Sequence, residues 1–196
     1  MNTRSFCLLL LLSIAAQGAD KDKRFRVNPA SSYPNKQAAS GLTIAAVPFT
    51  TGEQAKSAFG KVNPYEHGVL PVLVVMQNDS GKVLRLSHMT MHLVGPDRSK
   101  VEAVPPGDVQ YLEGPQRPNF GGSPLPNPFP RKKKNKLATP EIEGLGFHAK
   151  MLPAGESAHG FAYFQAGLRK GTTLYISGIV EAATGNELLF FEVPVE

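Results

Sequence analysis

Cysteine is nearly absent from the sequence: Cys7 is the only one among 196 residues, and it lies in the apolar stretch near the N-terminus. Once this stretch is removed on export, the chain has no disulfide and no thiol chemistry. Exported domains that depend on disulfides are usually much smaller than this one. We therefore expect a hydrophobic core to hold the fold together, for which about 150 residues are enough.

Long hydrophobic runs are also missing. The apolar stretch 7–16 is too short to span a membrane, which requires roughly 20 residues. Because Arg4 precedes this stretch and small residues follow it, the N-terminus has the three parts of a secretory signal peptide. We expect residues 1–18 to be that signal peptide, with cleavage after Gly18 and before Ala19. The sequence therefore predicts a secreted or periplasmic protein.

Common catalytic motifs are absent as well. The sequence has no His-Glu-x-x-His zinc motif, no phosphate-binding loop and no dinucleotide fingerprint. Ser157 and His159 would share one face of a strand, but His159 stands where the Gly-x-Ser-x-Gly nucleophile motif requires its second glycine. We expect no enzyme activity, no catalytic residues and no cofactor.

Positive charge is concentrated in two segments. Residues 19–40 carry five basic and two acidic side chains, and residues 113–137 carry six basic and one acidic. The rest of the mature chain therefore has a net charge of −4, although the whole sequence has a net charge of +5. Residues 19–40 have no apolar periodicity, which predicts a flexible leader. The six prolines and the Gly-Gly pair of residues 113–137 predict a long exposed loop.

Short apolar segments separated by turn residues predict an all-β fold for residues 41–196. The expected strands are Leu42–Val47, Val69–Gln77, Val83–Val94, Phe147–Leu152, Gly160–Gln165, Leu174–Val180 and Leu188–Val195. The second of these is almost continuously apolar, which predicts a central strand covered on both faces. In the third, the apolar alternation changes phase near Ser87 and His88, which indicates a bulge or a bend between two sheets.

Helix is expected at two places. Thr51 and Gln54 have the spacing of a capping box, which predicts a helix over Glu53–Phe59 that ends at Gly60. A single helical turn is expected at Pro106–Tyr111. The last two strands are expected to form a hairpin, and its predicted core residues are Leu174, Ile176, Leu189, Phe191 and Val193.

Two stretches resemble the telokin-like, immunoglobulin-like domains of exported bacterial proteins. One is residues 72–80, a buried strand that ends in Asn78 before a short turn, and the other is residues 152–164, a Pro-x-Gly turn that leads into an aromatic strand. The resemblance implies an immunoglobulin-like antiparallel β-sandwich, here with one short helix and a long Pro/Lys-rich loop. It also implies a non-enzymatic binding or accessory module.

The predicted binding residues form one basic run within the loop: Arg131, Lys132, Lys133, Lys134 and Lys136. Each basic residue near an anionic membrane contributes on the order of 1 kcal/mol to binding. The expected partners are an anionic envelope polymer, lipid headgroups or a protein. Nucleic acid is not favoured, because Phe120 and Phe129 are the only aromatic residues nearby that bases would stack on. The other interpretation is that the run only keeps the loop soluble.

A second candidate function, a periplasmic copper carrier, depends on the segment from His88 to His92, which also contains Met89 and Met91. Imidazole and thioether groups are ligands that copper accepts. In a regular strand, however, the two histidines lie roughly 13 Å apart, too far to share an ion without a bulge. The other interpretation is two exposed histidines with the methionines in the core.

Overall fold

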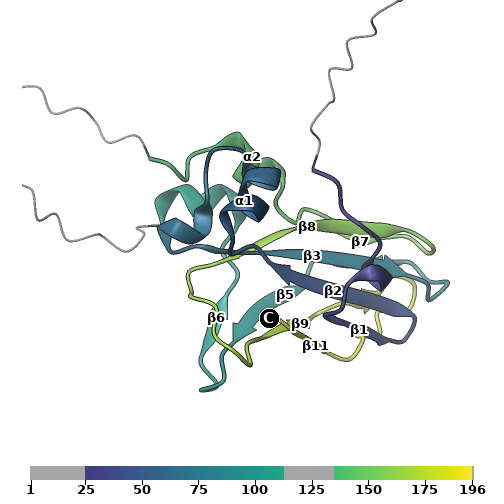
Figure 1. Ribbon diagram of the computed structural model, residues 1–196. Helices are drawn as coiled ribbons and strands as arrows, with labels where there is room; N and C mark the ends of the chain where they lie inside the picture. The colour runs from purple at the N-terminus through teal and green to yellow at the C-terminus, as the bar shows by residue number, and fades with distance from the viewer. Residues whose placement is uncertain (1–24, 113–134, 196) are drawn as a thin grey trace, which may run out of the picture.

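The computed structural model describes residues 25–112 and 135–195 (Figure 1). The predicted signal peptide, 1–18, and four of the predicted binding residues, Arg131, Lys132, Lys133 and Lys134, lie outside the described residues. The described part is mostly β-structure in three antiparallel sheets with few helices, which confirms the prediction of an all-β fold. It contains no helix that is long and apolar enough to cross a membrane.

The strands form three sheets. The first sheet has the order β1-β2-β3-β8, with β1 Lys36–Ala39, β2 Leu42–Pro48, β3 Leu70–Asn78 and β8 Ser157–Phe164. The second sheet has the order β11-β9-β5-β6, with β5 Thr90–Val94, β6 Lys100–Glu102, β9 Thr173–Ser177 and β11 Phe191–Pro194. The third sheet is small and has the order β10-β4-β7, with β4 Leu84–Arg85, β7 Met151–Leu152 and β10 Val180–Glu181.

The first sheet packs face to face on the second, and the side chains between them form a first core. Alternate residues of β2 and β3 point into it, because successive side chains of a strand point to opposite faces. These residues meet the inward side chains of β5, β9 and β11. Its buried members include Ile44, Val72, Val74, Leu93, Leu174, Ile176, Phe191 and Val193.

The opposite face of the first sheet is covered by helices, which creates a second core (Figure 1). The covering elements are α1 Gly52–Phe59, α2 Pro140–Gly144 and the 3₁₀ helix η3 Pro106–Tyr111. They pack Phe59, Val109 and Ile142 against Leu73, Val75, Phe161 and Tyr163 of the sheet. Strand β3 is therefore buried on both faces, which explains its continuous apolar sequence and confirms that it is central.

The change of apolar phase near Ser87 marks a change of sheet. Strand β4 pairs with β7 and β10 in the third sheet, whereas β5 pairs with β6 and β9 in the second. Leu84 and Met91 nevertheless both lie in the first core. The bend between the two strands lets residues of opposite parity face the same core, as the phase shift predicts.

The predicted helices are present, with additions. Helix α1 begins with the expected capping box: Thr51 Oγ1 accepts a hydrogen bond from Gln54 N at 3.3 Å, and Gln54 Oε1 accepts one from Thr51 N at 3.2 Å. The helical turn at Pro106–Tyr111 is η3. The sequence analysis missed three short helices, namely α2, η1 Ala30–Ser32 and η2 Pro64–His67. All three are of five residues or fewer, too short for a periodic pattern.

The prediction that residues 19–40 form a flexible leader is wrong from Phe25 onward. Residues 36–39 form the edge strand β1, which pairs with β2. Upstream of it, the Phe25 ring packs with the rings of Phe49 and Phe161, with centroid distances of 5.7 and 5.5 Å. A few apolar side chains that fill a gap over the first sheet are enough to order this polar segment, although they have no periodicity.

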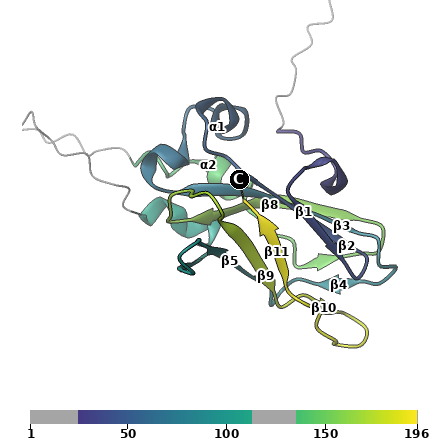
Figure 2. The same cartoon turned by 60° about the horizontal axis from the view of Figure 1, so that its bottom comes forward.

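The hairpin prediction is confirmed in pairing but wrong at Leu189. Strand β11 pairs with β9 as expected (Figure 2), and Phe191 and Val193 are buried. Leu189, however, is 75% exposed. The chain between Glu187 and Phe190 is irregular, so the strand alternation does not extend back to Leu189, and Leu188 packs against the first core instead.

Candidate binding site

A cavity of about 1220 Å³ lies between the segment that contains α1 and η2 and the segment that precedes α2. We call it the lysine cavity. Its first wall comprises Gly52, Ala55, Lys56, Gly60, Lys61, Val62, Asn63, Glu66 and His67, and its second wall comprises Leu112, Asn135, Lys136, Leu137, Ala138, Thr139 and Pro140. The cavity therefore joins parts of the chain that are about 50 to 90 residues apart in sequence.

The first wall follows from how α1 ends. Gly60 caps the helix with a φ of +67°, a value that a residue with a side chain rarely adopts, and the chain turns there. Asn63 Oδ1 then accepts a hydrogen bond from Tyr65 N at 3.1 Å and begins η2. As a result, Lys56 and Lys61, on either side of Gly60, both line the cavity.

The second wall is held by two side-chain hydrogen bonds. The Asn135 side-chain amide donates to the Gln110 carbonyl of η3, and Asn135 Oδ1 accepts from Leu137 N at 3.0 Å. Leu137 is buried in the second core. These contacts fix the backbone of residues 135–137 and, with it, the position from which Lys136 extends.

The lysine cavity carries a positive charge on a domain that is otherwise acidic. Lys56, Lys61 and Lys136 are exposed, and none of them forms an ion pair with another described residue. Glu66 is the only acidic residue among those that line the cavity, and its carboxylate accepts a hydrogen bond from Asn63 Nδ2 at 3.2 Å. The lining of the cavity therefore carries three ammonium groups and one carboxylate, and this excess of positive charge favours an anionic ligand.

One polar atom of the second wall lacks a partner. The Thr139 hydroxyl is the only buried side-chain nitrogen or oxygen of the described residues that forms no hydrogen bond. Thr139 is also the N-cap of α2, yet its side chain makes no capping bond. Because more than nine tenths of buried polar groups in proteins are hydrogen-bonded, this hydroxyl marks a place where a partner is missing.

Of the predicted binding residues, Lys136 lies on the lysine cavity, and the other four lie outside the described residues. The sequence analysis missed Lys56 and Lys61. Each is an isolated lysine in sequence, at a helix end and in a link, and no local pattern relates either of them to Lys136. Only the packing of α1 beside the segment before α2 brings them together.

The two histidines of the copper prediction lie in different surroundings. His88 is exposed in the turn between β4 and β5, and His92 lies in β5 on the outer face of the second sheet, opposite Tyr175 and Glu102. Met91 is in the first core and Met89 packs against it, as the alternative interpretation expects. Within residues 25–112 and 135–195, no three His, Cys, Asp or Glu residues are grouped so as to hold a metal ion.

Ser157 and His159 are both exposed near the start of β8. They pair with Gln77 and Val75 of β3, and no hydrogen bond between the two side chains is present. Residues two apart on one strand point to the same face, but nothing in their described surroundings activates the serine.

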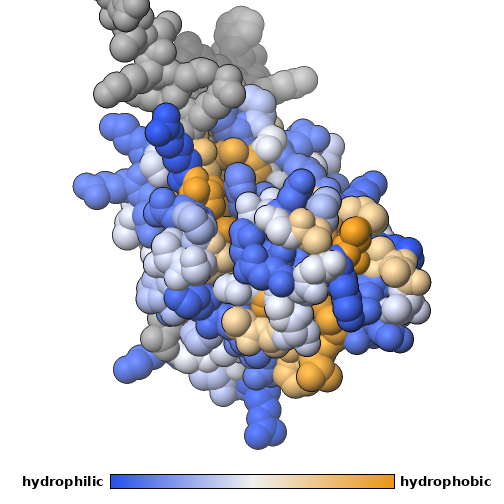
Figure 3. All heavy atoms as spheres, turned by 90° about the vertical axis from the view of Figure 1, so that its right-hand side faces the viewer, coloured by the Kyte–Doolittle hydropathy of each residue, from blue (hydrophilic) through white to orange (hydrophobic). Residues whose placement is uncertain are grey.

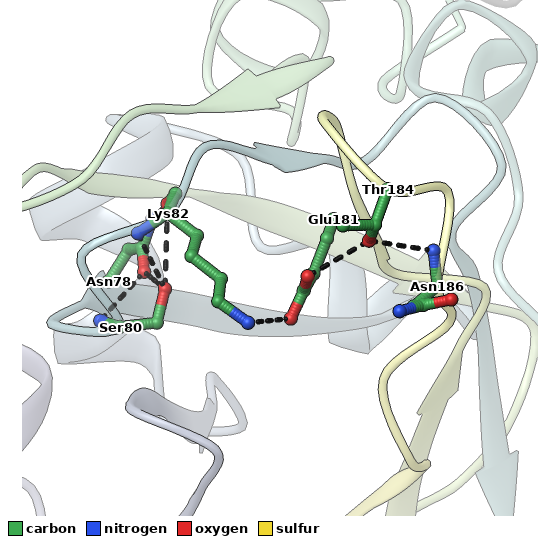
Figure 4. Close-up of polar contacts among 6 residues, drawn as sticks. All are labelled: Asn78, Ser80, Lys82, Glu181, Thr184 and Asn186. Carbon is green, nitrogen blue, oxygen red and sulfur yellow. Dashed lines mark hydrogen bonds and ion pairs between the residues drawn. The ribbon is translucent and has the colours of Figure 1, made fainter.

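A second hollow of about 630 Å³ lies at the third sheet and is lined by residues of its strands and of the adjoining turns, among them Lys82, Val83, Met151 and Glu181. Figure 4 shows that Lys82 and Glu181 point toward each other and form an ion pair, and Thr184 Oγ1 donates to Glu181 at 2.9 Å. The hydrogen bond from Lys82 is the main reason why the pKa of Glu181 lies below its ordinary value. The lysine of this hollow is thus already neutralised.

The surface on the right-hand side of the molecule as drawn in Figure 1 is largely hydrophilic. Figure 3 shows apolar side chains in separate patches rather than in one continuous area. Val83 and Met151 of the second hollow are 40% and 51% exposed. Apolar exposure of this extent is ordinary for a protein surface and does not by itself indicate an interface.

Comparison with known proteins does not place the chain in a family. No protein-family model matches it, and no curated protein matches it. Among solved structures, a candidate lipoprotein from Bacillus subtilis (ycdA) is similar over 81% of this chain, with 11% identity and a TM-score of 0.38. The chain spans 38% of the length of that protein, and a likeness this low assigns neither fold nor function.

Proposed function

We propose that this protein is a non-enzymatic, extracytoplasmic binding module of the immunoglobulin-like β-sandwich type that holds an anionic component of the cell envelope. The signal-peptide pattern of residues 1–18 supports export. Two antiparallel sheets that enclose one core support the sandwich. The proposed binding residues are the three lysines of the cavity together with Arg131, Lys132, Lys133 and Lys134, which lie outside the described residues.

The observation that carries this proposal is the convergence of three lysines on one cavity. Lys56 and Lys61 come from the end of α1, Lys136 comes from the end of the Pro/Lys-rich loop, and none has an acidic partner among the described residues. Unpaired ammonium groups gathered on an acidic domain repel one another, so the arrangement is most stable when an anion neutralises them.

The test is binding of the mature protein to vesicles that contain an anionic phospholipid and to inorganic polyphosphate, at low and at physiological salt. Replacing Lys56, Lys61 and Lys136 by Gln should weaken binding on the order of 100-fold at low salt, at about 1 kcal/mol for each charge. Parent binding should also fall as salt rises.

The matched control replaces Arg98, Lys150 and Lys170 by Gln, which removes the same charge from exposed positions outside the cavity. The control should bind almost as tightly as the parent protein. If the parent binds neither probe at low salt, the proposed function is wrong. If both variants lose binding equally, only the net charge matters, and the lysine cavity is not the site.

A further inference from the structure

We infer that the ligand of the lysine cavity is an amphipathic phosphate: a phosphate monoester headgroup held by the lysines, with an apolar chain along the rest of the wall. The inference rests on the proposed function and selects one ligand class for the same site. It is carried by the charges of the cavity and by its apolar wall.

The charges favour phosphate over a carboxylate. Three lysines, Lys56, Lys61 and Lys136, line a cavity in which Glu66 is the only described acidic residue. A phosphate monoester carries close to two negative charges at neutral pH, and its three terminal oxygens are strong acceptors. Lysine binds phosphate as a point charge. A single carboxylate would leave most of the positive charge of this cavity without a partner.

The apolar part of the wall is what separates an amphiphile from a fully hydrated polyanion. Val62 and Leu112 are partly buried against the second core, and Leu137 belongs to it, yet all three also line the cavity. Ala138 and Pro140 extend this wall toward α2. A polyanion such as polyphosphate has nothing to place against these side chains, whereas an alkyl chain removes their surface from water.

The unpartnered hydroxyl lies beside the same apolar wall. Thr139 lines both the lysine cavity and an adjoining hollow of about 280 Å³, and the two hollows share residues 137–140. Its buried oxygen lacks a hydrogen bond in the described structure. This oxygen is itself buried, so the phosphate headgroup is assigned to the exposed lysines and not to Thr139.

The hollow of about 630 Å³ at the third sheet is less suited to bind an anionic headgroup. Its lysine, Lys82, is paired with Glu181, so an entering phosphate would have to displace a carboxylate that Thr184 also holds. The three lysines of the lysine cavity form no ion pair with a described residue, so they need no such exchange. The lysine cavity, and not the hollow at the third sheet, is therefore suited to bind an anionic headgroup.

The experiment titrates the mature protein by calorimetry with ethyl, butyl, hexyl and octyl phosphate, each below its micelle concentration, with octanol and inorganic phosphate as controls. Affinity should rise with chain length, up to about fourfold for each methylene that is buried. Octanol and inorganic phosphate should both bind far more weakly than octyl phosphate. An affinity that does not change from ethyl to octyl phosphate would overturn the inference.

Two pairs of variants locate the site. Lys56→Gln with Lys61→Gln should weaken octyl phosphate binding at least tenfold, whereas Lys150→Gln with Lys170→Gln should leave it unchanged. Gly52→Trp places a bulky side chain on the cavity wall, and Gly167→Trp places one on an exposed loop elsewhere. A Cβ at either position meets no atom within 4 Å, and neither glycine has a positive φ, so the two positions are matched. Only the first tryptophan should weaken binding. Equal effects within either pair would place the phosphate elsewhere.

The outcomes separate this inference from the proposed function. If the parent binds polyphosphate and anionic vesicles but binds octyl phosphate no more tightly than ethyl phosphate, the binding module stands and the amphiphile is wrong. If no anionic probe binds, both are wrong.

Discussion

The Tyr163 hydroxyl of β8 donates a hydrogen bond of 2.7 Å to the carbonyl oxygen of Ile142 in α2. Tyr163 is fully buried, and burial raises the pKa of its phenol well above the usual range, so the hydroxyl stays protonated and remains a donor. This bond ties the helix that follows the second wall of the lysine cavity to the first sheet.

Tyr163→Phe should therefore lower the free energy of unfolding by about 1–2 kcal/mol, because the buried Ile142 carbonyl loses its partner. Urea unfolding of parent and variant measures the difference. Tyr175→Phe is the control, since that hydroxyl lies on the outer face of the second sheet and makes no hydrogen bond with a described residue. Equal stability of Tyr163→Phe and the parent protein would show that the bond contributes nothing.

Asn78 organises the turn after β3 through hydrogen bonds at both ends of its amide. Its Nδ2 approaches the carbonyls of Lys82, Leu152 and Pro153 at 2.7–3.0 Å, and its Oδ1 accepts from Ser80 (Figure 4). Asn78→Leu should cost about 2–4 kcal/mol, because one buried and several partly buried backbone groups lose their partner together.

Asn186→Ala is the control for Asn78→Leu: the Asn186 side chain is exposed, and the substitution should change stability by less than about 0.5 kcal/mol. Thermal unfolding of both variants compares them directly. A small effect at Asn78 would mean that the turn does not depend on its side chain.

Phe25 should stabilise the folded domain, although it lies in a segment whose sequence suggests a flexible leader. Phe25→Ala removes a ring that packs on Phe49 and Phe161 and should cost about 1–3 kcal/mol. Arg26→Ala, at the next and exposed position, should have almost no effect. Denaturant unfolding at matched protein concentration compares the two variants with the parent protein. If Phe25→Ala is as stable as the parent, the Phe25 ring does not stabilise the domain.

Asp97 should titrate at unusually low pH. Hydrogen bonds from the Ser99 hydroxyl and backbone, and then from Arg169, lower its pKa from 3.8 to about 2. Because the folded pKa is the lower one, its contribution to stability is complete above pH 4 and is lost as the pH falls toward 2. Ser99→Ala should raise the pKa of Asp97 toward 3.8 in an NMR carboxyl titration. An unchanged value in that variant would contradict the assignment.

The positions of His88 and His92 allow a test of the copper hypothesis. If His88 and His92 only occupy an exposed turn and an outer sheet face, replacing both by Ala should change neither stability nor metal content. Titration of the parent protein with Cu(I) and Cu(II) measures this directly. Tight uptake of one copper per chain that disappears in the double variant would make the copper carrier the better description.

Much of the fold is predictable from local sequence. The capping box at Thr51, the central strand β3 and the change of phase before β5 are each determined by residues close together in sequence. Their side-chain periodicity and local hydrogen bonds can therefore be predicted from the sequence. The second core is less visible, since the helices that build it are too short to show a period. Phe25 is ordered by contact with the rings of Phe49 and Phe161, which are distant in sequence. Leu189 is exposed because the regular strand begins only at Phe191.

The candidate site divides in the same way. By itself, the sequence determined that positive charge is concentrated near residues 131–136, because charge is a property of composition. Only the tertiary structure brought Lys56, Lys61 and Lys136 to one cavity, together with the apolar side chains of Val62, Leu112 and Leu137. That arrangement arises when α1 and the segment before α2 pack on the same face of the first sheet. The hydrophobic contacts that drive this packing are non-directional, so the local sequence does not indicate which polar groups the packing brings together.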